Sequence, residues 1–192
     1  MNSKLYHYFV INRTHRNLRR DFSQDLAAEF SVLGLSPEER MTRRFELLCQ
    51  AEKPQIQPFE KIVLMRTVKK QPDIFTEAEW ADIKAKHYIH ELGYVSNLSL
   101  DYGRVIGSGL LAVRENADEY GRRVIDAIID LCDRYKRLAV EQDRRDVVEV
   151  LSRVPRYGAT NFREALQMFR ILHYALWLEG DYHNTVGRFD QY

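Results

Sequence analysis

Apolar residues recur every three or four positions along most of this chain, which is the spacing of helices with one buried face. The clearest helix start is Ser36-Pro37-Glu38-Glu39. There the serine hydroxyl can cap the helix, the proline fits its first turn, and Glu39 can reach back to the cap. We therefore predict a helix from this point to about Glu52, with an apolar stripe formed by Met41, Phe45, Leu48 and Cys49.

The same start signal recurs at Thr76-Glu77-Ala78-Glu79, and it predicts a helix that ends near Gly93. Periodic apolar positions predict four more helices, at about 101–113, 114–138, 140–153 and 165–179. The last of these is apolar on almost every side, which is typical of a helix buried in a larger body. Gly103, Gly107 and Gly109 weaken the helix at 101–113, and they indicate close packing against another backbone.

Prolines separate the first two helices. The stretch P-Q-I-Q-P-F-E-K-I-V-L-M-R-T-V, residues 54–68, cannot be helical at its prolines, and 62–68 is a short apolar run of strand type. We predict that it is extended. With roughly six helices and little strand, the fold class is mainly α, and 192 residues are too few for two ordinary domains. We therefore treat 1–192 as a single helical segment.

Charge and composition exclude several classes of partner. The 29 basic and 28 acidic residues nearly cancel, so no net field draws the chain to nucleic acid or to a membrane surface. No stretch is apolar for long enough to span a bilayer, and the start lacks the pattern of a secretory signal. These features predict a cytoplasmic protein. Cys49 and Cys132 lie far apart in predicted helices and are expected to be buried free thiols.

The sequence offers few candidates for metal or phosphate chemistry. His87 and His90 are three positions apart with Glu91 beside them, whereas the zinc-protease pattern needs histidines four apart. We predict that no metal is bound. The run G-R-V-I-G-S-G, residues 103–109, does not have the glycine order of a dinucleotide-binding loop.

The densest polar chemistry lies at 183–192, H-N-T-V-G-R-F-D-Q-Y. Gly187 suits a tight loop, Arg188 carries a fixed cation with planar donors, and Asp190 supplies a carboxylate. Such a cluster can orient a small polar ligand, and it can equally form a structural ion-pair corner. Residue types alone favour the ion-pair corner.

Three stretches carry a resemblance to a known family. G-R-F-D-Q-Y, preceded by a helix ending L-W-L-E-G, resembles the G-R-x-D-Q motif of the glycyl radical enzymes, the pyruvate formate-lyase-like family. L-S-L-D-Y-G-R-V-I-G-S-G-L-L-A-V-R-E is similar to a helix of that family, and E-R-M-T-R-R-F-E-L-L followed by P-Q-I-Q-P-F-E-K-I-V-L is similar to its early helix and extended segment. The resemblance covers roughly residues 20–192.

The resemblance implies a larger enzyme, a ten-stranded α/β barrel wrapped in helices, of which this chain is the helical amino-terminal layer without the barrel core. Family members are C–C or C–X bond lyases, dehydratases or formate acetyltransferases of anaerobic cytoplasm, and they are often homodimers. Their glycyl radical is made by a separate iron–sulfur activating enzyme that cleaves S-adenosylmethionine. The radical glycine and the catalytic cysteine lie beyond the G-R-x-D-Q motif, and Cys49 and Cys132 are in the wrong context to replace them. We therefore expect no catalysis from this chain alone.

For substrate binding the resemblance points to Asp190 and, less directly, to Tyr182, while the residue chemistry adds Arg188. A carboxylate at Asp190 would accept a hydrogen bond from a hydroxyl group and repel an anionic substrate, which favours a dehydratase or lyase. The substrate itself is not fixed by these residues. Two alternatives stay open: a stand-alone helical interaction module without catalysis, and a small enzyme using His183 and Asp190 as an acid–base pair.

Overall fold

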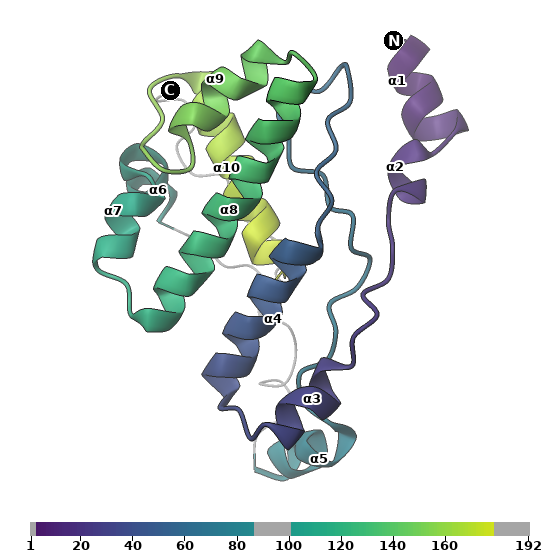
Figure 1. The fold of residues 1–192 in the computed structure, drawn as a ribbon, viewed down its shortest axis with the longest axis vertical. Coiled ribbons are helices and arrows are strands. Elements are labelled where there is room, and N and C mark those ends of the chain that lie inside the picture. The colour runs from purple at the N-terminus through teal and green to yellow at the C-terminus, as the bar shows by residue number, and fades with distance from the viewer. Residues whose placement is uncertain (1–2, 87–100, 179–192) are drawn as a thin grey trace.

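The computed structural model describes residues 3–86 and 101–178. Helices follow one another along these residues, joined by turns and one long extended stretch (Figure 1). Their bounds are α1 (Ser3–Tyr6), the π-helix η1 (His7–Ile11), α2 (Thr14–Asn17), α3 (Leu26–Val32), α4 (Pro37–Ala51), α5 (Glu77–Lys86), α6 (Tyr102–Ser108), α7 (Leu110–Glu115), α8 (Glu119–Glu141), α9 (Arg145–Arg153) and α10 (Phe162–Leu178).

The two helix starts with capping signals are confirmed. At α4 the Ser36 hydroxyl accepts a hydrogen bond from the Glu39 amide at 3.3 Å. The Glu39 carboxylate, predicted to reach back to the cap, instead accepts from the Arg123 guanidinium at 2.6 Å. At α5 the Thr76 hydroxyl accepts from the Glu79 amide at 3.3 Å, and the Glu79 carboxylate accepts from the Thr76 amide at 2.8 Å. The predicted end of this helix near Gly93 lies outside the described residues.

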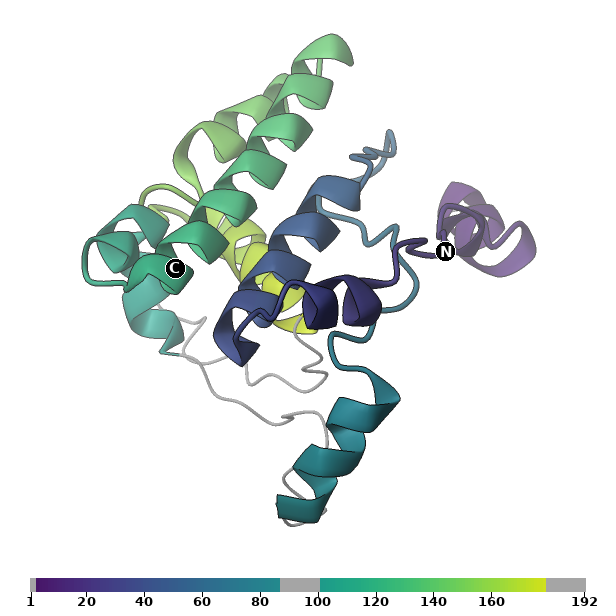
Figure 2. The same ribbon diagram turned by 60° about the horizontal axis from the view of Figure 1, so that its bottom comes forward.

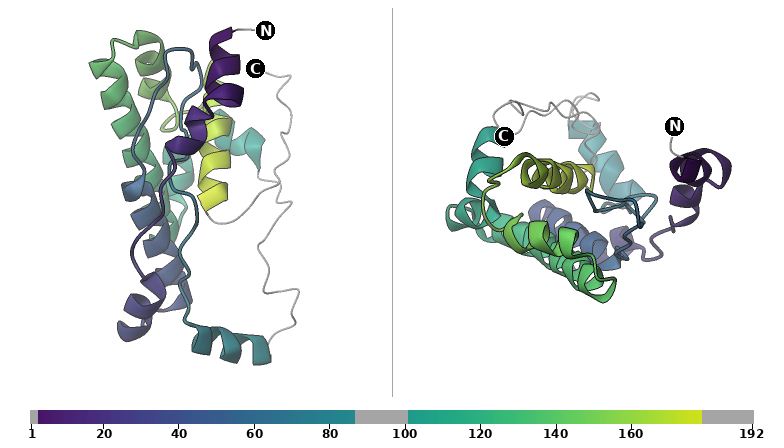
Figure 3. Two further views of the ribbon diagram at one scale, coloured as in Figure 1. Left: turned by 90° about the vertical axis from the view of Figure 1, so that its right-hand side faces the viewer. Right: turned by 90° about the horizontal axis from the view of Figure 1, so that it is seen from above.

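The core forms around the paired helices α4 and α8. Helices α4 and α8 pack side by side, α9 folds back on α8, and α10 packs against α6 and α9 (Figures 1 and 2). Seen from above, α10 lies inside the ring of helices and extended chain (Figure 3). Its side chains meet those of α8 and α9 in the centre of the core, at Leu131, Tyr135, Leu151, Met168 and Ile171. The prediction of a buried final helix is confirmed for Phe162–Leu178.

The predicted single helix at 101–113 is wrong, because Gly109 divides it into α6 and α7. Gly109 has a φ of +83°, and a Cβ atom there would overlap the backbone of Arg156 and Tyr157. The Leu110 amide donates to the Pro155 carbonyl at 2.8 Å across this break. The predicted close approach of two backbones is therefore confirmed at Gly109, and it interrupts the helix.

Two further boundaries differ from the prediction. The segment expected to be helical from residue 114 begins at Glu119, because the Asp118 side chain caps it by accepting from the Gly121 amide at 2.7 Å. The helix expected from residue 140 begins at Arg145, because Asp143 turns the chain with a φ of +50°.

The short helices α1, η1, α2 and α3 were not predicted, since segments of four to seven residues are too short to display a helical period.

Residues 54–68 contain no helix, as predicted, but they turn at Pro58 and Phe59 and form no strand in the part of the chain that the structure describes. One isolated parallel bridge joins Arg20 to Val68. There the Arg20 amide donates to the Thr67 carbonyl at 2.8 Å, and the Lys69 amide donates to the Arg20 carbonyl at 2.9 Å. Side chains provide hydrogen-bond partners for much of the remaining backbone of this stretch. The strand-type reading of 62–68 is therefore wrong, whereas its apolar residues Val63, Leu64 and Val68 are buried.

Cys49 and Cys132 are free and buried, as predicted. Among residues 3–86 and 101–178, no helix combines the length and the apolar character that crossing a bilayer requires.

Candidate functional site

The residues assigned to substrate binding from the sequence, Tyr182, Arg188 and Asp190, lie outside the described residues, so their roles stay predictions. The same holds for His183 and Gly187. The structure does describe α10, which ends at Leu178, directly before this segment in the chain. The contacts that hold α10 in place therefore determine where the chain enters the stretch that contains the predicted substrate-binding residues.

Residues 62–71, which we name the clamp segment, run along α10. The side-chain amide of Gln167 accepts a hydrogen bond from the Val63 amide at 2.8 Å and donates one to the Val63 carbonyl at 3.1 Å. One turn later, the Arg170 guanidinium donates to the Leu64 carbonyl at 2.5 Å. Because Gln167 and Arg170 are three positions apart, they lie on the same face of the helix. This face of α10 replaces the partner strand that the clamp segment lacks.

The clamp segment also holds the end of α10. The Arg66 guanidinium lies over the indole of Trp177, with Cζ 3.3 Å from the ring centroid. The Gln71 side chain donates to the Trp177 carbonyl at 2.5 Å. The last carbonyl groups of a helix have no donor within the helix, so Gln71 satisfies one of them. The same ten residues thus contact both the middle and the end of α10.

Two buried polar side chains form hydrogen bonds with the backbone of the clamp segment. Glu52 is 2% exposed, and its carboxylate accepts from the amides of Thr67 and Val68 at 2.7 and 3.1 Å, and from the Thr67 hydroxyl. The Tyr135 hydroxyl accepts from the Met65 amide at 3.0 Å and donates to the Met65 carbonyl at 3.1 Å. Buried backbone groups need such partners, and these come from the end of α4 and from α8.

Burial changes the acid–base properties of this interior. It raises the pKa of Tyr135 and of Tyr174, and the nearby Glu52 carboxylate raises both further. Burial also lowers the pKa of Arg170. A tyrosine with a raised pKa keeps its proton, and the Tyr135 hydroxyl donates that proton to the Met65 carbonyl. The hydrogen bonds of this cluster hold the clamp segment against α8 and α10.

A second polar cluster lies where the extended stretch turns at 57–60. The Glu60 carboxylate accepts from the Gln57 amide at 2.6 Å, and burial raises the pKa of Glu60. The Arg144 guanidinium donates to the Glu60 carbonyl at 2.5 Å and to the Asp146 carboxylate at 2.9 Å. The hydrogen bond from Arg144 holds the pKa of Asp146 well below its usual range. The hydrogen bonds of Arg144 therefore join the turn at 57–60 to the start of α9.

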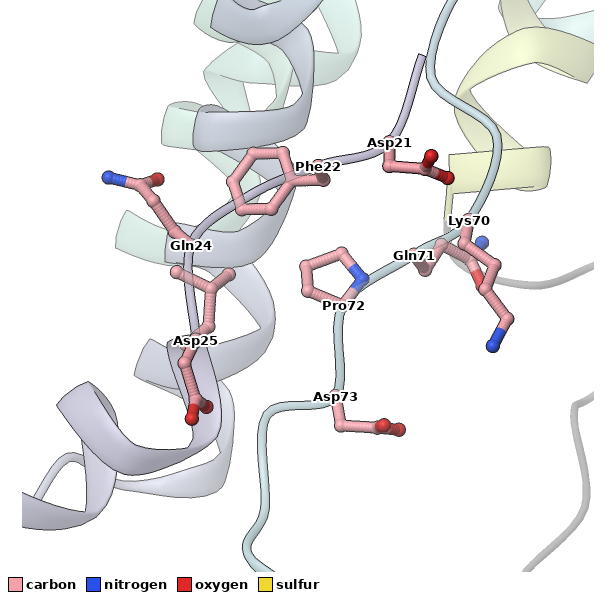
Figure 4. Close-up of a pocket in the computed structure, with 9 residues that line it drawn as sticks. Asp21, Phe22, Gln24, Asp25, Lys70, Gln71, Pro72 and Asp73 are labelled. Carbon is pink, nitrogen blue, oxygen red and sulfur yellow. The ribbon is translucent and has the colours of Figure 1, made fainter. Parts of the chain in front are cut away.

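A cavity of about 330 Å³ lies beside the end of the clamp segment (Figure 4). Two of its three carboxylates already have partners. Asp25 accepts from the Ala28 amide at 3.1 Å as the cap of α3, and Asp21 pairs with Lys69 at 3.1 Å. Gln71 lines the cavity and also bonds the end of α10, so the cavity adjoins the clamp. The lining residues are Asp21, Phe22, Gln24, Asp25, Leu26, Lys70, Gln71, Pro72 and Asp73.

Other candidate chemistry is weak in the described residues. Burial raises the pKa of the Cys132 thiol, so it is not an activated nucleophile. Across 3–86 and 101–178, no three histidine, cysteine or acidic side chains group together as metal ligands would. His90 and Glu91 lie outside those ranges, as does His87. The glycine-rich run at 103–109 forms α6 and the break that follows it, not a phosphate-binding loop.

The clamp segment was missed from the sequence, although a signal for it exists. Gln167 and Arg170 are polar positions three apart on a largely apolar helix, and Gln167 is buried. Polar groups buried on an apolar helix must find hydrogen-bond partners. An extended segment with unpaired backbone groups, such as 62–68, is a suitable partner.

Comparison with known proteins agrees with the helical arrangement. A family model described as pyruvate formate lyase-like matches residues 8–192. A solved structure concerned with 1,2-propanediol dehydration in Roseburia inulinivorans matches with a TM-score of 0.62 at 18% sequence identity, over 88% of this chain. No curated protein matches the chain in sequence.

The structural match covers 32% of the Roseburia chain, so the present chain spans about a third of that protein's length. At 18% identity the likeness shows a shared fold over the matched part. The family model extends over nearly the whole chain and includes the G-R-F-D-Q motif at 187–191. This chain therefore belongs to the pyruvate formate lyase-like family.

Proposed function

We propose that residues 1–192 form one helical segment of a glycyl radical enzyme and contribute a substrate-orienting loop to its active site. The family match over residues 8–192 carries this proposal. The packing of α10 supports it, because the clamp segment holds the middle and the end of the helix that precedes residues 179–192 in the chain. In this role Asp190 accepts a hydrogen bond from the substrate, and Tyr182 and Arg188 orient it.

The substrate class follows from the charge of Asp190. A carboxylate favours a neutral hydroxylated molecule or a cation over an anion. The solved neighbour concerns the dehydration of 1,2-propanediol, which is a neutral diol. Dehydratase or lyase chemistry on such a molecule is therefore favoured over formate acetyltransferase chemistry on pyruvate, which is an anion.

The enzyme also needs components outside these residues. A glycyl radical, made by an iron–sulfur activating enzyme that uses S-adenosylmethionine, would supply the radical chemistry. Such an enzyme would work in anaerobic cytoplasm, and a homodimer is the expected assembly. Cys49 and Cys132 are both buried and do not provide the reactive thiol.

The test begins with the coding sequence downstream of Tyr192. We expect barrel segments, a catalytic cysteine and a radical glycine in the same reading frame or the neighbouring one. The polypeptide or assembly with these parts, activated without oxygen, is expected to convert propane-1,2-diol to propanal and water. Asp190→Asn should lower turnover by at least about tenfold, since a charged hydrogen bond is lost, and Asp181→Asn is the matched control.

Three outcomes would count against this function. A genuine stop with no such segment nearby favours the stand-alone helical interaction module. Turnover by the 192-residue chain itself, abolished by Asp190→Asn, favours the small independent enzyme. Equal turnover in both asparagine variants removes Asp190 from the substrate site.

A further inference from the structure

The first twenty residues differ in charge from the rest of the chain. They contain five basic residues and no acidic one. All 28 acidic residues and 24 of the 29 basic ones lie in 21–192, so that remainder has a net charge of minus four. We name residues 3–20 the arm and residues 21–178 the body. The near-neutral total therefore hides a strongly basic segment at one end of the chain.

The arm turns a set of apolar side chains away from the body. Tyr8 is only 7% exposed, whereas Tyr6 and Val10, two positions before and after it, are 42% and 51% exposed. Positions two apart on a helix do not face each other, and positions four apart share a face. Tyr6 and Val10 therefore lie together on the side opposite Tyr8. Ile11, beside Val10, is 56% exposed and enlarges the apolar surface of the arm.

The arm contacts the body only over a small area. Tyr8 packs edge-on against Phe59, with ring centroids 5.0 Å apart, and its hydroxyl lies 3.8 Å from the Met65 sulfur. A second contact is the bridge between Arg20 and Val68. Figures 2 and 3 show α1, η1 and α2 at one edge of the molecule, beside the body and not within it. The outward side of the arm is therefore open to a partner.

The arginines of the arm are not neutralised by ion pairs. Arg13, Arg16 and Arg19 are exposed, and none of them pairs with a carboxylate in the residues that the structure describes. On the body, by contrast, Arg123 pairs with Glu39 and with a second glutamate of α4. The positive charge of the arm is therefore available to attract an anionic partner.

We propose that the arm docks on a lipid bilayer that carries anionic head groups. Segments that lie at a bilayer surface combine basic side chains, which meet the head groups, with apolar side chains that enter the boundary beneath them. Single-stranded nucleic acid is also anionic, but its bases are held by stacking on aromatic rings. The aliphatic side chains of Val10 and Ile11 offer no stacking surface. The charge of the arm thus favours an anionic surface, and its aliphatic side chains favour lipid.

The negative charge of the body does not prevent this docking. Salt at physiological concentration weakens the interaction of exposed charges that are more than about 8 Å apart. Because the arm lies at one edge of the molecule, it can face the bilayer while the body lies on the side away from the head groups (Figure 3). The inference rests on charge and exposure and does not depend on the proposed radical chemistry.

Flotation of the full 192-residue chain with lipid vesicles tests the proposal. Binding to phosphatidylcholine vesicles that contain about 30% phosphatidylserine should be at least about tenfold stronger than binding to phosphatidylcholine alone, since each basic residue near an anionic surface strengthens binding by about fivefold. Raising the NaCl concentration from about 50 mM to about 300 mM should weaken this binding, because salt screens exposed charges.

Paired charge variants identify the arm as the part that binds. Arg13→Gln/Arg16→Gln should raise the lipid concentration needed for half-maximal binding by at least about tenfold. The matched control, Arg104→Gln/Arg122→Gln, removes the same charge at exposed positions on the body. It should raise that lipid concentration by less than about twofold, because these side chains lie away from the bilayer.

A further variant separates apolar contact from charge. Val10→Ser/Ile11→Ser keeps every charge and removes exposed apolar area, so it should weaken vesicle binding by at least about threefold. Circular dichroism melting checks the folding of each variant. The melting midpoint should stay near that of the parent, because these side chains lie outside the core.

Four results would overturn the proposal. If the chain does not bind the phosphatidylserine vesicles, or if the arm and body charge variants weaken binding equally, then the arm is not a lipid-binding surface. Equal binding to vesicles with and without phosphatidylserine would show that the anionic head groups play no part. Binding to single-stranded polyuridylate that the arm variants weaken, by a chain that does not bind vesicles, would assign the arm to nucleic acid instead.

Discussion

The guanidinium of Arg66 lies over the indole ring of Trp177, with Cζ 3.3 Å from the ring centroid. Arg66 belongs to the extended clamp segment, and Trp177 belongs to the last turn of α10. This contact joins two parts of the chain more than a hundred positions apart. It secures the end of the helix that leads into the predicted site segment.

Replacing Arg66 with alanine should lower the free energy of unfolding by about 1 kcal/mol, which is typical of a partly desolvated cation–π contact. The emission spectrum of Trp177 should change because its cation is lost. Urea unfolding followed by fluorescence in a Trp80→Phe background measures both effects. Arg66→Lys should retain part of the stability, and equal stability of the alanine variant and the parent would show that the stacking contributes nothing.

Replacing Gln167 with leucine should lower the free energy of unfolding by about 3 kcal/mol. Both the amide and the carbonyl of Val63 would then lack a partner in the interior, and leaving buried polar groups unpaired is costly. Chemical denaturation measures the loss. Gln50→Leu, at an exposed position on α4, is the matched control and should change stability by less than about 0.5 kcal/mol.

Gly109→Ala should destabilise the protein by more than about 2 kcal/mol. The residue has a φ of +83°, and the new Cβ would overlap the backbone of Arg156 and Tyr157. Gly103→Ala tests the opposite case, because a Cβ there has ample room on helix α6. It should be neutral or stabilise by up to about 1 kcal/mol, since alanine favours helix more than glycine does. Thermal unfolding that ranks the two variants in the reverse order would contradict the structure.

Asp146 should contribute to acid sensitivity. The Arg144 guanidinium, with Arg163 and Lys61, holds the pKa of this carboxyl well below its unfolded value. The folded state therefore binds fewer protons, and the stabilisation is present above about pH 4 and lost as the pH falls toward the lowered pKa. In Asp146→Asn, the free energy of unfolding should fall less steeply below about pH 4 than in the parent.

The matched control for this pH experiment is Asp143→Asn. The ion pair between Asp143 and Arg145 is almost fully exposed, with side chains 83% and 91% accessible. Its loss should therefore leave the fall in the free energy of unfolding below about pH 4 unchanged. If the free energy of unfolding falls equally steeply with acid in the parent and in Asp146→Asn, then Asp146 does not contribute to the loss of stability at low pH.

Local chemistry in the sequence was enough to place the helices that have clear caps. Ser36 and Thr76 predicted α4 and α5 because a capping hydroxyl accepts from the amide three positions later, and at α5 Glu79 also accepts from the Thr76 amide. The burial of Cys49 and Cys132 was predicted from the general tendency of free cysteines to lie in the interior. The G-R-F-D-Q motif indicated the family, and the family match over 8–192 confirms it.

The tertiary structure alone decided what depends on contacts between distant residues. The split at Gly109 exists because the Arg156 and Tyr157 backbone occupies the space beside it, and the apolar period at 101–113 gives no sign of that neighbour. The extended segment at 62–68 has strand composition, yet it pairs with side chains of Glu52, Tyr135 and Gln167 because α10 lies where a partner strand would be. Helical periodicity and capping are local properties that a sequence displays directly, whereas hydrogen bonds across a hundred positions form only once the core has brought those groups together.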